Sequence, residues 1–407
     1  RADDDELKRQ QHRDIFSEHK DQILEGALRW DAPAAKVYLG LYSDIDREIS
    51  PPDRVTDWLG ADISEACLAG FEATLFRTDL PTPKEVAESY ANGKYWHFIH
   101  PVIAGLAERN SKGDSFSDIP PEVIEMGWYG LLGELLDGSD GMTALSDAIV
   151  GQLAADQSRF KAAIRQWFEP HLDASKDHIT GLYSFVRDKR FANFAPELAL
   201  DWLSKYSEVS YNTLVELIGA VLRDEINNQC QLRAKLADLA FQRCLNGCKS
   251  QLESTWLAAL FVTDFERFET VKDEKPSLDK NLIWSIRNTI SYDRSNETAR
   301  IELDTQQLGW VIKEFRPRWP KIERPSGVTT GNMNPWDAVS FIEQTIAALA
   351  KRTDDDAIEL LRSFTLEADG YTNLIRAAFA DQARLLIERK FEPASIISFK
   401  HELDDSP

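Results

Sequence analysis

The chain has 407 residues, of which 68 are acidic and 47 are Lys or Arg, so its formal net charge at pH 7 is −21. This acidity argues against a protein that coats nucleic acid, because such a protein needs a basic face to release counterions from phosphates. Hydrophobic residues make up 43% of the chain and aromatic residues 10%. That is enough to build buried cores and excludes disorder for most of the length.

Four cysteines are too few for a disulfide scaffold in a chain of this length, so we expect a reducing, cytoplasmic compartment. No stretch approaches about 18 uninterrupted apolar residues, and we therefore expect no membrane span. The chain opens on Arg1 with a helical pattern and without a signal-peptide pattern. We interpret it as a piece of a larger protein.

In chain order, apolar residues at helical spacing first predict a charged helix over residues 3–28 and a second helix over residues 34–42. The runs Ser50-Pro51-Pro52-Asp53 and Thr82-Pro83-Lys84-Glu85 then predict helix starts, since each has a capping residue, a proline in the first turn and an acid three residues on. The run Asn334-Pro335-Trp336-Asp337 has the same pattern. Short helices entered by tight turns follow from these signals.

After residue 334 the spacing predicts three helices, and Gln382 is the single polar residue on the apolar face of the third. We interpret the acidic run Asp354–Asp356 as the first turn of the second helix rather than as a magnesium site, because acids are favoured there by the helix dipole. Strand signals are scarce: Ile301-Glu302-Leu303 alternates over too few residues to matter. The sequence predicts an all-α chain.

Helix pairs that each expose an apolar face favour an α-solenoid of stacked helix pairs, of the HEAT or armadillo type, with a C-terminal helical trio. A stretch rich in proline and glycine divides the predicted domains into a helical repeat body (1–315), a connection (316–333) and a C-terminal helical subdomain (334–407). Within the connection we expect Trp319 to be an anchor and residues 326–331 to be exposed and sensitive to proteases.

Sequence motifs for nucleotide or metal chemistry are weak. The run Gly247-Cys248-Lys249-Ser250 lacks the earlier glycine and the preceding strand of a phosphate-binding loop, so we expect neither ATP binding nor any other cofactor. Cys244 and Cys248 lie four residues apart, with Cys230 earlier, but a zinc site needs a fourth ligand. We interpret these cysteines as small buried apolar residues.

Two histidine clusters are candidate catalytic or metal-binding sites. His97 and His100 lie close in sequence, and His171, Asp173 and His178 follow one another after a proline. Their spacing fits no hydrolase or metalloprotease motif, and a polar loop between helices explains it equally well. We expect no catalytic or metal-ligating residue, with a divergent enzyme site near His171, Asp173 and His178 kept as an alternative.

The most basic short segment carries Arg316, Arg318, Trp319 and Lys321, which are the candidate contacts with a partner or with nucleic acid. Arginine can pair with phosphates and tryptophan can stack on bases. The alternative, which we favour, is that Trp319 packs onto the helices while the charges stay solvated.

Several runs resemble the helical repeat region of large bacterial NACHT-type NTPases of the STAND class. They are Ile49–Gly60 with Ala66–Glu72, Phe315–Pro320 with Asn334–Ala338, and Tyr371–Arg376 continuing to Phe391-Glu392-Pro393. Proteins of that family are similar to immune NLRs, and many are implicated in defence against phage. The resemblance implies a non-catalytic sensor or scaffold that binds a protein trigger or adjoining domains.

The family's phosphate-binding loop and Walker acids have no counterpart in this chain, so its ATPase activity is not expected here. We expect a protein partner rather than nucleic acid, and no membrane. The alternative from a different class is a stand-alone helical adaptor, or a protease substrate cut at residues 326–331.

Overall fold

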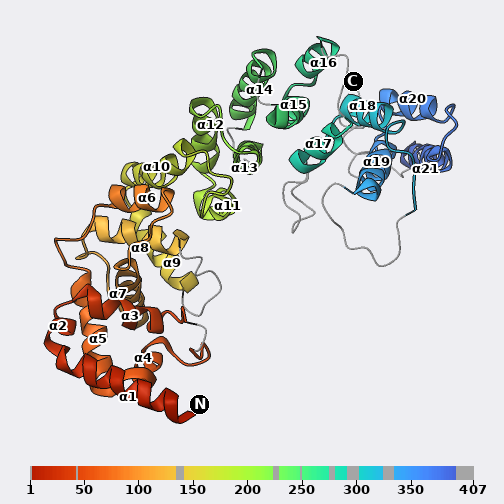
Figure 1. Cartoon of the computed structure of the whole chain (residues 1–407). Helices are drawn as coiled ribbons and strands as arrows, with labels where there is room; N and C mark the ends of the chain where they lie inside the picture. The colour runs from red at the N-terminus through yellow and green to blue at the C-terminus, as the bar shows by residue number, and fades with distance from the viewer. Residues whose placement is uncertain are drawn as a thin grey trace, which may run out of the picture. The chain divides into compact units, whose positions relative to one another are not determined.

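The computed structural model describes residues 2–42, 45–133, 142–222, 229–247, 250–274, 280–290, 302–323 and 334–390. These ranges contain 21 α-helices and one short 3-10 helix, and no β-strand (Figure 1). The prediction of an all-α chain is confirmed. No helix in the described part of the chain combines the length and apolarity needed to cross a membrane.

The chain divides into two compact units, each described here by itself. The N-terminal unit comprises Arg1–Phe194 and Tyr206–Thr213, and the C-terminal unit comprises Ala195–Lys205 and Leu214–Pro407. The helices of the N-terminal unit are α1 Ala2–Glu18, α2 Lys20–Leu24, α3 Leu28–Tyr38, α4 Pro51–Leu59, α5 Ala61–Thr74, α6 Pro83–Ala91, α7 Ile99–Lys112, α8 Pro121–Gly133, α9 Met142–Ala154, α10 Gln157–Asp173, α11 Leu182–Arg187 and the 3-10 helix η1 Lys189–Phe191.

Helix α7 lies in the core of the N-terminal unit, where it contacts α3, α5, α8 and α9. Ten consecutive residues of this helix, 99–108, are buried, and all of them except His100 and Glu108 are apolar, as expected of a helix enclosed on every side. Gly105 permits the contact with α5, because a Cβ atom at this position would lie 2.6 Å from the backbone oxygen of Phe71. The small residue therefore brings two helix backbones close together.

The predicted N-terminal helix over residues 3–28 is wrong in its extent. Helix α1 ends at Glu18, α2 is a separate five-residue helix, and Gly26 turns the chain with a φ of +78° before α3 begins. The second predicted helix stops at Tyr38, and Gly40, with a φ of +65°, follows it. Glycine adopts these left-handed conformations without steric cost and ends both helical runs.

All three predicted helix starts are confirmed. Thr82 and Glu85 form a reciprocal capping box at the start of α6. At the start of α4 the Ser50 hydroxyl instead hydrogen-bonds the Asp53 carboxylate at 2.6 Å and does not cap the backbone. Asn334 likewise makes no side-chain cap bond at the start of α19 (Pro335–Ala350). Proline and the first-turn acid are the features that these two starts share.

In the C-terminal unit, α19, α20 (Asp355–Phe364) and α21 (Thr372–Lys390) contact one another, so the predicted C-terminal trio is confirmed. Helix α18 also contacts α19 and α20. The predicted domain boundary at 316–333 thus falls inside one compact unit, and residues 324–333 lie outside the described ranges. The helices of the C-terminal unit are α12 Ala195–Lys205, α13 Tyr211–Leu222 (which begins in the N-terminal unit), α14 Gln229–Leu245, α15 Ser250–Thr263, α16 Phe265–Glu274, α17 Leu282–Ile290, α18 Thr305–Phe315, α19 Pro335–Ala350, α20 Asp355–Phe364 and α21 Thr372–Lys390.

The contacts between helices do not by themselves identify a solenoid. Helices close in the chain pack together, as α14 does with α15 and α15 with α17. In the N-terminal unit α3 also packs against α7, and α6 against α10. Such contacts occur in solenoids and in other all-α folds. The α-solenoid of HEAT or armadillo type stays a prediction.

Candidate functional site

Arg316, the first of the predicted contact residues, is enclosed by the C-terminal unit. Its side chain is 1% exposed and forms ion pairs with Asp369 and with Glu367, the latter at 3.3 Å. The guanidinium also donates to the backbone oxygens of Phe364 at 3.3 Å and of Glu367 at 3.2 Å. Arg316 therefore joins the end of α18 to the loop between α20 and α21, and it does not face a partner.

The other predicted contact residues reach the surface but have partners within the chain. Arg318 pairs with Glu314 at 2.7 Å, and Lys321 pairs with Glu343 at 3.0 Å. Trp319 is half-buried and anchored, as its indole N–H donates to the Lys280 backbone oxygen at 3.2 Å. The packing of Trp319 agrees with the favoured alternative, whereas the buried Arg316 contradicts its expectation that the charges stay solvated. The predicted protease site, residues 326–331, lies outside the described residues.

His171, Asp173 and His178 do not share one environment. His171 is 2% exposed, and neither of its ring nitrogens has a hydrogen-bond partner among the described residues. Burial, together with the nearby charge of Lys176, lowers the pKa of His171 to about 4, so the ring is neutral at pH 7. Asp173 and His178 are exposed. His97 is exposed as well, whereas His100 is buried with its Nδ1 atom 3.2 Å from the His97 backbone oxygen.

The acidic run and the cysteines, which are the candidate metal ligands, have structural roles where the structure describes them. Asp354 caps α20 by accepting a hydrogen bond from the Ala357 N–H at 2.9 Å, which confirms the helix-start interpretation of the acidic run. Cys244 is buried, as predicted, whereas Cys248 and the side chain of Cys230 lie outside the described set. Within that set, no group of three or more His, Cys, Asp or Glu side chains is placed to hold a metal ion.

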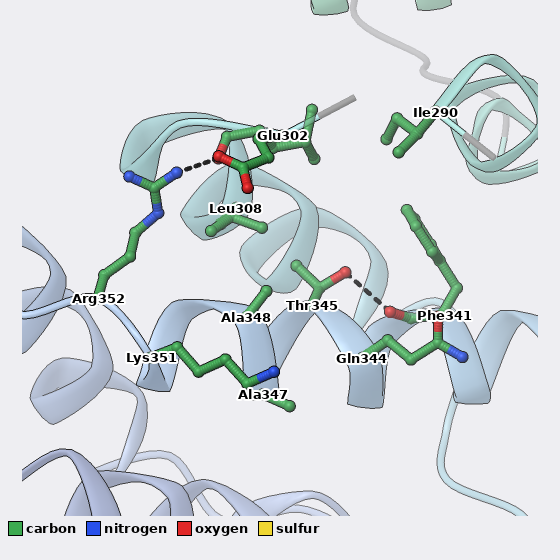
Figure 2. A pocket seen from close by; sticks show the side chains of 11 residues that line it. Ile290, Glu302, Leu308, Phe341, Gln344, Thr345, Ala347, Ala348, Lys351 and Arg352 are labelled. Atoms are coloured by element: carbon green, nitrogen blue, oxygen red, sulfur yellow. Dashed lines mark hydrogen bonds between the residues drawn. The ribbon is translucent and has the colours of Figure 1, made fainter. Parts of the chain in front are cut away.

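A cavity of about 590 Å³ in the C-terminal unit is the candidate functional site. It lies at the last residue of α17, the segment that enters α18, and one side of α19 with the two residues after it (Figure 2). Its volume is within the range typical of ligand pockets. The lining residues are Ile290, Glu302, Leu303, Leu308, Phe341, Gln344, Thr345, Ala347, Ala348, Lys351 and Arg352.

The cavity combines an apolar floor with a polar rim. Ile290, Leu308 and Phe341 are almost fully buried and supply the floor. The Thr345 hydroxyl donates to the Phe341 backbone oxygen at 2.8 Å, so its methyl group is the part left for apolar contact (Figure 2). The exposed rim carries charges of both signs, in Glu302 on one side and Lys351 on the other. Such a surface can bury an apolar group while its polar flanks stay in water.

A polar network holds the walls of the cavity together. Arg352 donates to the backbone oxygen of Leu303, which links the end of α19 to the entry of α18. Thr305, at the first position of α18, donates to the Asp354 carboxylate at 3.2 Å. The buried Gln382 amide donates to the Arg352 backbone oxygen at 2.8 Å. The polar interruption noted on the third C-terminal helix is therefore a cap for the chain that leaves α19.

No sequence motif marks the residues that line the cavity. Phe341, Thr345 and Ala348 follow one another at spacings of four and three residues, so they share one side of α19. Arg352 continues the same spacing two residues beyond the end of the helix. This side lies next to the fully buried residues Ile342, Ile346 and Leu349 of the same helix. The signal that could have found it is an apolar arc wider than one helix–helix contact needs.

No protein-family model, no curated protein and no solved structure matches this chain. The functional argument therefore depends on the chain's own residues.

Proposed function

We propose that the chain is a non-catalytic helical scaffold that binds a protein partner, and that the cavity in the C-terminal unit receives an apolar part of that partner. The observation that supports this is a cavity of about 590 Å³ whose apolar floor lies beneath a charged rim. Burying one large aliphatic or aromatic side chain there would contribute about 1.5–3 kcal/mol to binding.

Two features of the lining favour a polypeptide as the occupant. Ala347 and Ala348 are exposed on α19, so another backbone can approach this helix closely. Glu302 and Lys351 offer partners of both signs to polar groups that flank the inserted side chain. Partner helices and extended peptides bind grooves in this way, with apolar anchors between polar contacts.

We propose further that this scaffold serves in the cytoplasm as the sensor segment of a multidomain STAND-type defence NTPase. The support is the resemblance of the runs Ile49–Gly60 and Phe315–Pro320 to the helical region of that family. Determining the full coding sequence around this segment tests the idea. A NACHT ATPase domain in the same reading frame would support it, and its absence would favour the stand-alone adaptor.

The binding proposal is tested with Ala348→Trp, which fills the cavity from an exposed position on α19. The matched control is Ala383→Trp, an exposed alanine of α21 that does not line the cavity. Proteins captured by each variant from extracts of the source cells are quantified by mass spectrometry. We expect a partner that the control retains and that Ala348→Trp loses by about tenfold, the effect of removing about 1.4 kcal/mol. Identical capture by both variants, at equal melting temperatures, would show that the cavity is not the partner site.

A further inference from the structure

A short loop of the N-terminal unit exposes two large aromatic rings side by side in sequence. Residues 93–97, named here the aromatic loop, connect α6 to α7 and read Gly-Lys-Tyr-Trp-His. Tyr95 is 64% exposed and Trp96 is 38% exposed. Single exposed apolar residues are ordinary on protein surfaces, whereas adjacent exposed tyrosine and tryptophan are the residue types that dominate binding hot spots.

The exposed rings are supported from below by buried ones. The Tyr95 ring packs against the Tyr90 ring in a T-shaped arrangement, with ring centroids 5.1 Å apart, and the buried Tyr90 packs against Trp167 at 5.2 Å. Trp96 packs against the buried Phe98 at 5.9 Å. Side chains held in this way lose little conformational freedom when a partner covers them. The aromatic loop is therefore suited to act as a preformed anchor.

The aromatic loop itself carries no acidic residue, unlike the chain as a whole. Residues 89–107 contain no Asp or Glu, although the chain has 68 of them, and both Lys94 and His97 are exposed. Lys176 adds a further cation, with its ammonium group 3.5 Å from the Tyr90 backbone oxygen. The exposed Asp173 and Asp177 are the acids on that neighbouring segment.

We propose that the aromatic loop is a docking surface for an acidic segment of a protein partner, which places an apolar side chain against Tyr95 and Trp96 and carboxylates beside Lys94. This proposal goes beyond the proposed cavity function, because the loop belongs to the other compact unit. The binding test of the cavity and that of the loop can therefore fail independently of each other. The net charge of −21 disfavours the competing occupant, a single-stranded nucleic acid, since that ligand needs a continuous basic groove.

The test uses phage-displayed random peptides of about twelve residues, the length of a typical recognition segment. They are selected on the full chain and depleted on the double variant Tyr95→Ser, Trp96→Ser. We expect the surviving peptides to be enriched in Asp and Glu over the starting library. The best of them should bind the double variant about tenfold more weakly, the usual scale for losing hot-spot residues.

Two single variants separate the charge contribution from unrelated effects. Lys94→Glu should weaken the same peptide several-fold, and raising the salt from about 50 to about 300 mM should weaken it as well. Tyr183→Ser removes another exposed tyrosine of the same unit and should leave the affinity unchanged. If the double variant has a lower melting temperature than the wild type, the effect of Lys94→Glu on peptide affinity is the test of whether the peptide binds at the aromatic loop.

Three outcomes would overturn the proposal. The first is that no peptide survives depletion, and the second is that the survivors carry no excess of acidic residues. The third is that an oligothymidylate of about 20 nucleotides binds in a manner that depends on Trp96, which would assign the loop to nucleic acid.

Discussion

Replacing Arg316 with methionine should destabilise the C-terminal unit more than the same replacement of Arg318 or Lys321, the other two charged residues of the predicted contact segment. The variant keeps an apolar stem but loses the charge that joins α18 to the loop between α20 and α21. Asp369 and Glu367 then lose their cation, and the backbone oxygens of Phe364 and Glu367 lose their donor.

The magnitude follows from the exposure of the groups left behind. Breaking a fully buried ion pair by removing one partner costs about 3–5 kcal/mol. Here the side chains of Asp369 and Glu367 are 34% and 61% exposed, so water can rehydrate both carboxylates. The loss that remains is mainly that of the hydrogen bonds to the two carbonyls, which places the expected destabilisation at about 2–3 kcal/mol.

The assay is urea unfolding followed by tryptophan fluorescence, with hydrogen exchange read at residues 365–371. Arg318→Met is the matched control, because it removes a partly exposed i,i+4 pair with Glu314, whose carboxylate keeps Lys272 as a partner at 3.3 Å, and it should cost no more than about 0.5 kcal/mol. Arg316→Lys should restore less than half of the loss, since an ammonium group lacks the fork that reaches several acceptors. A loss below about 1 kcal/mol for Arg316→Met, or one equal to that of the control, would refute the reasoning.

The remaining predictions concern buried groups of the N-terminal unit. Burial, opposed by the charge of Arg77, raises the pKa of Asp31 to about 8, so the folded state holds a proton that the unfolded chain releases near pH 4. Stability should therefore fall as pH rises from about 4 to about 8, by up to about 1.4 kcal/mol per pH unit, and Asp31→Asn should flatten this slope in urea titrations. The pKa of His171 is lowered to about 4 against an ordinary value of about 6.5, so the stability it contributes is lost as pH falls through that window. His171→Leu should remove this acid sensitivity in thermal melts at pH 4.5 and 7. Gly70→Ala should lower the melting temperature, because the new Cβ atom would lie 2.2 Å from a backbone oxygen of α2. Gly151→Ala should instead stabilise helix α9 by about 0.5–1 kcal/mol, since nothing lies within 4 Å of its Cβ position; equal shifts for the two glycine variants would contradict the packing argument.

Local signals explain why the sequence predicts the helical class and many helix starts. The run Thr82-Pro83-Lys84-Glu85 carries its own capping box, and Asp354 caps α20 from three residues away. These interactions close within one turn, so residue order alone specifies them. The predicted extent of the N-terminal helix is wrong because the helical spacing of apolar residues continues across Gly26, where the backbone takes a φ of +78°.

Long-range pairing explains what the sequence did not reveal. Arg316 lies among other basic residues and next to a proline, which is the composition of a solvated connection. Its partners are about 50 positions further along the chain, and no local pattern connects them. The same holds for Gln382, whose acceptors lie on the chain that leaves α19. A cavity is harder still to foresee, because it is a property of three segments that meet in space.

The proline-containing connection illustrates the limit of reading a domain boundary from composition. Proline ends a helix, but it does not determine whether the helices on its two sides pack together. Arg316 and the Tyr371 hydroxyl, which donates to the Trp319 backbone oxygen at 2.7 Å, hold the start of the connection against the C-terminal trio. Since α18 and α19 also form two walls of the cavity, Arg316→Met should weaken partner binding together with stability. Ala348→Trp should weaken binding by about tenfold while stability is kept, so the two variants distinguish a damaged cavity from a filled one.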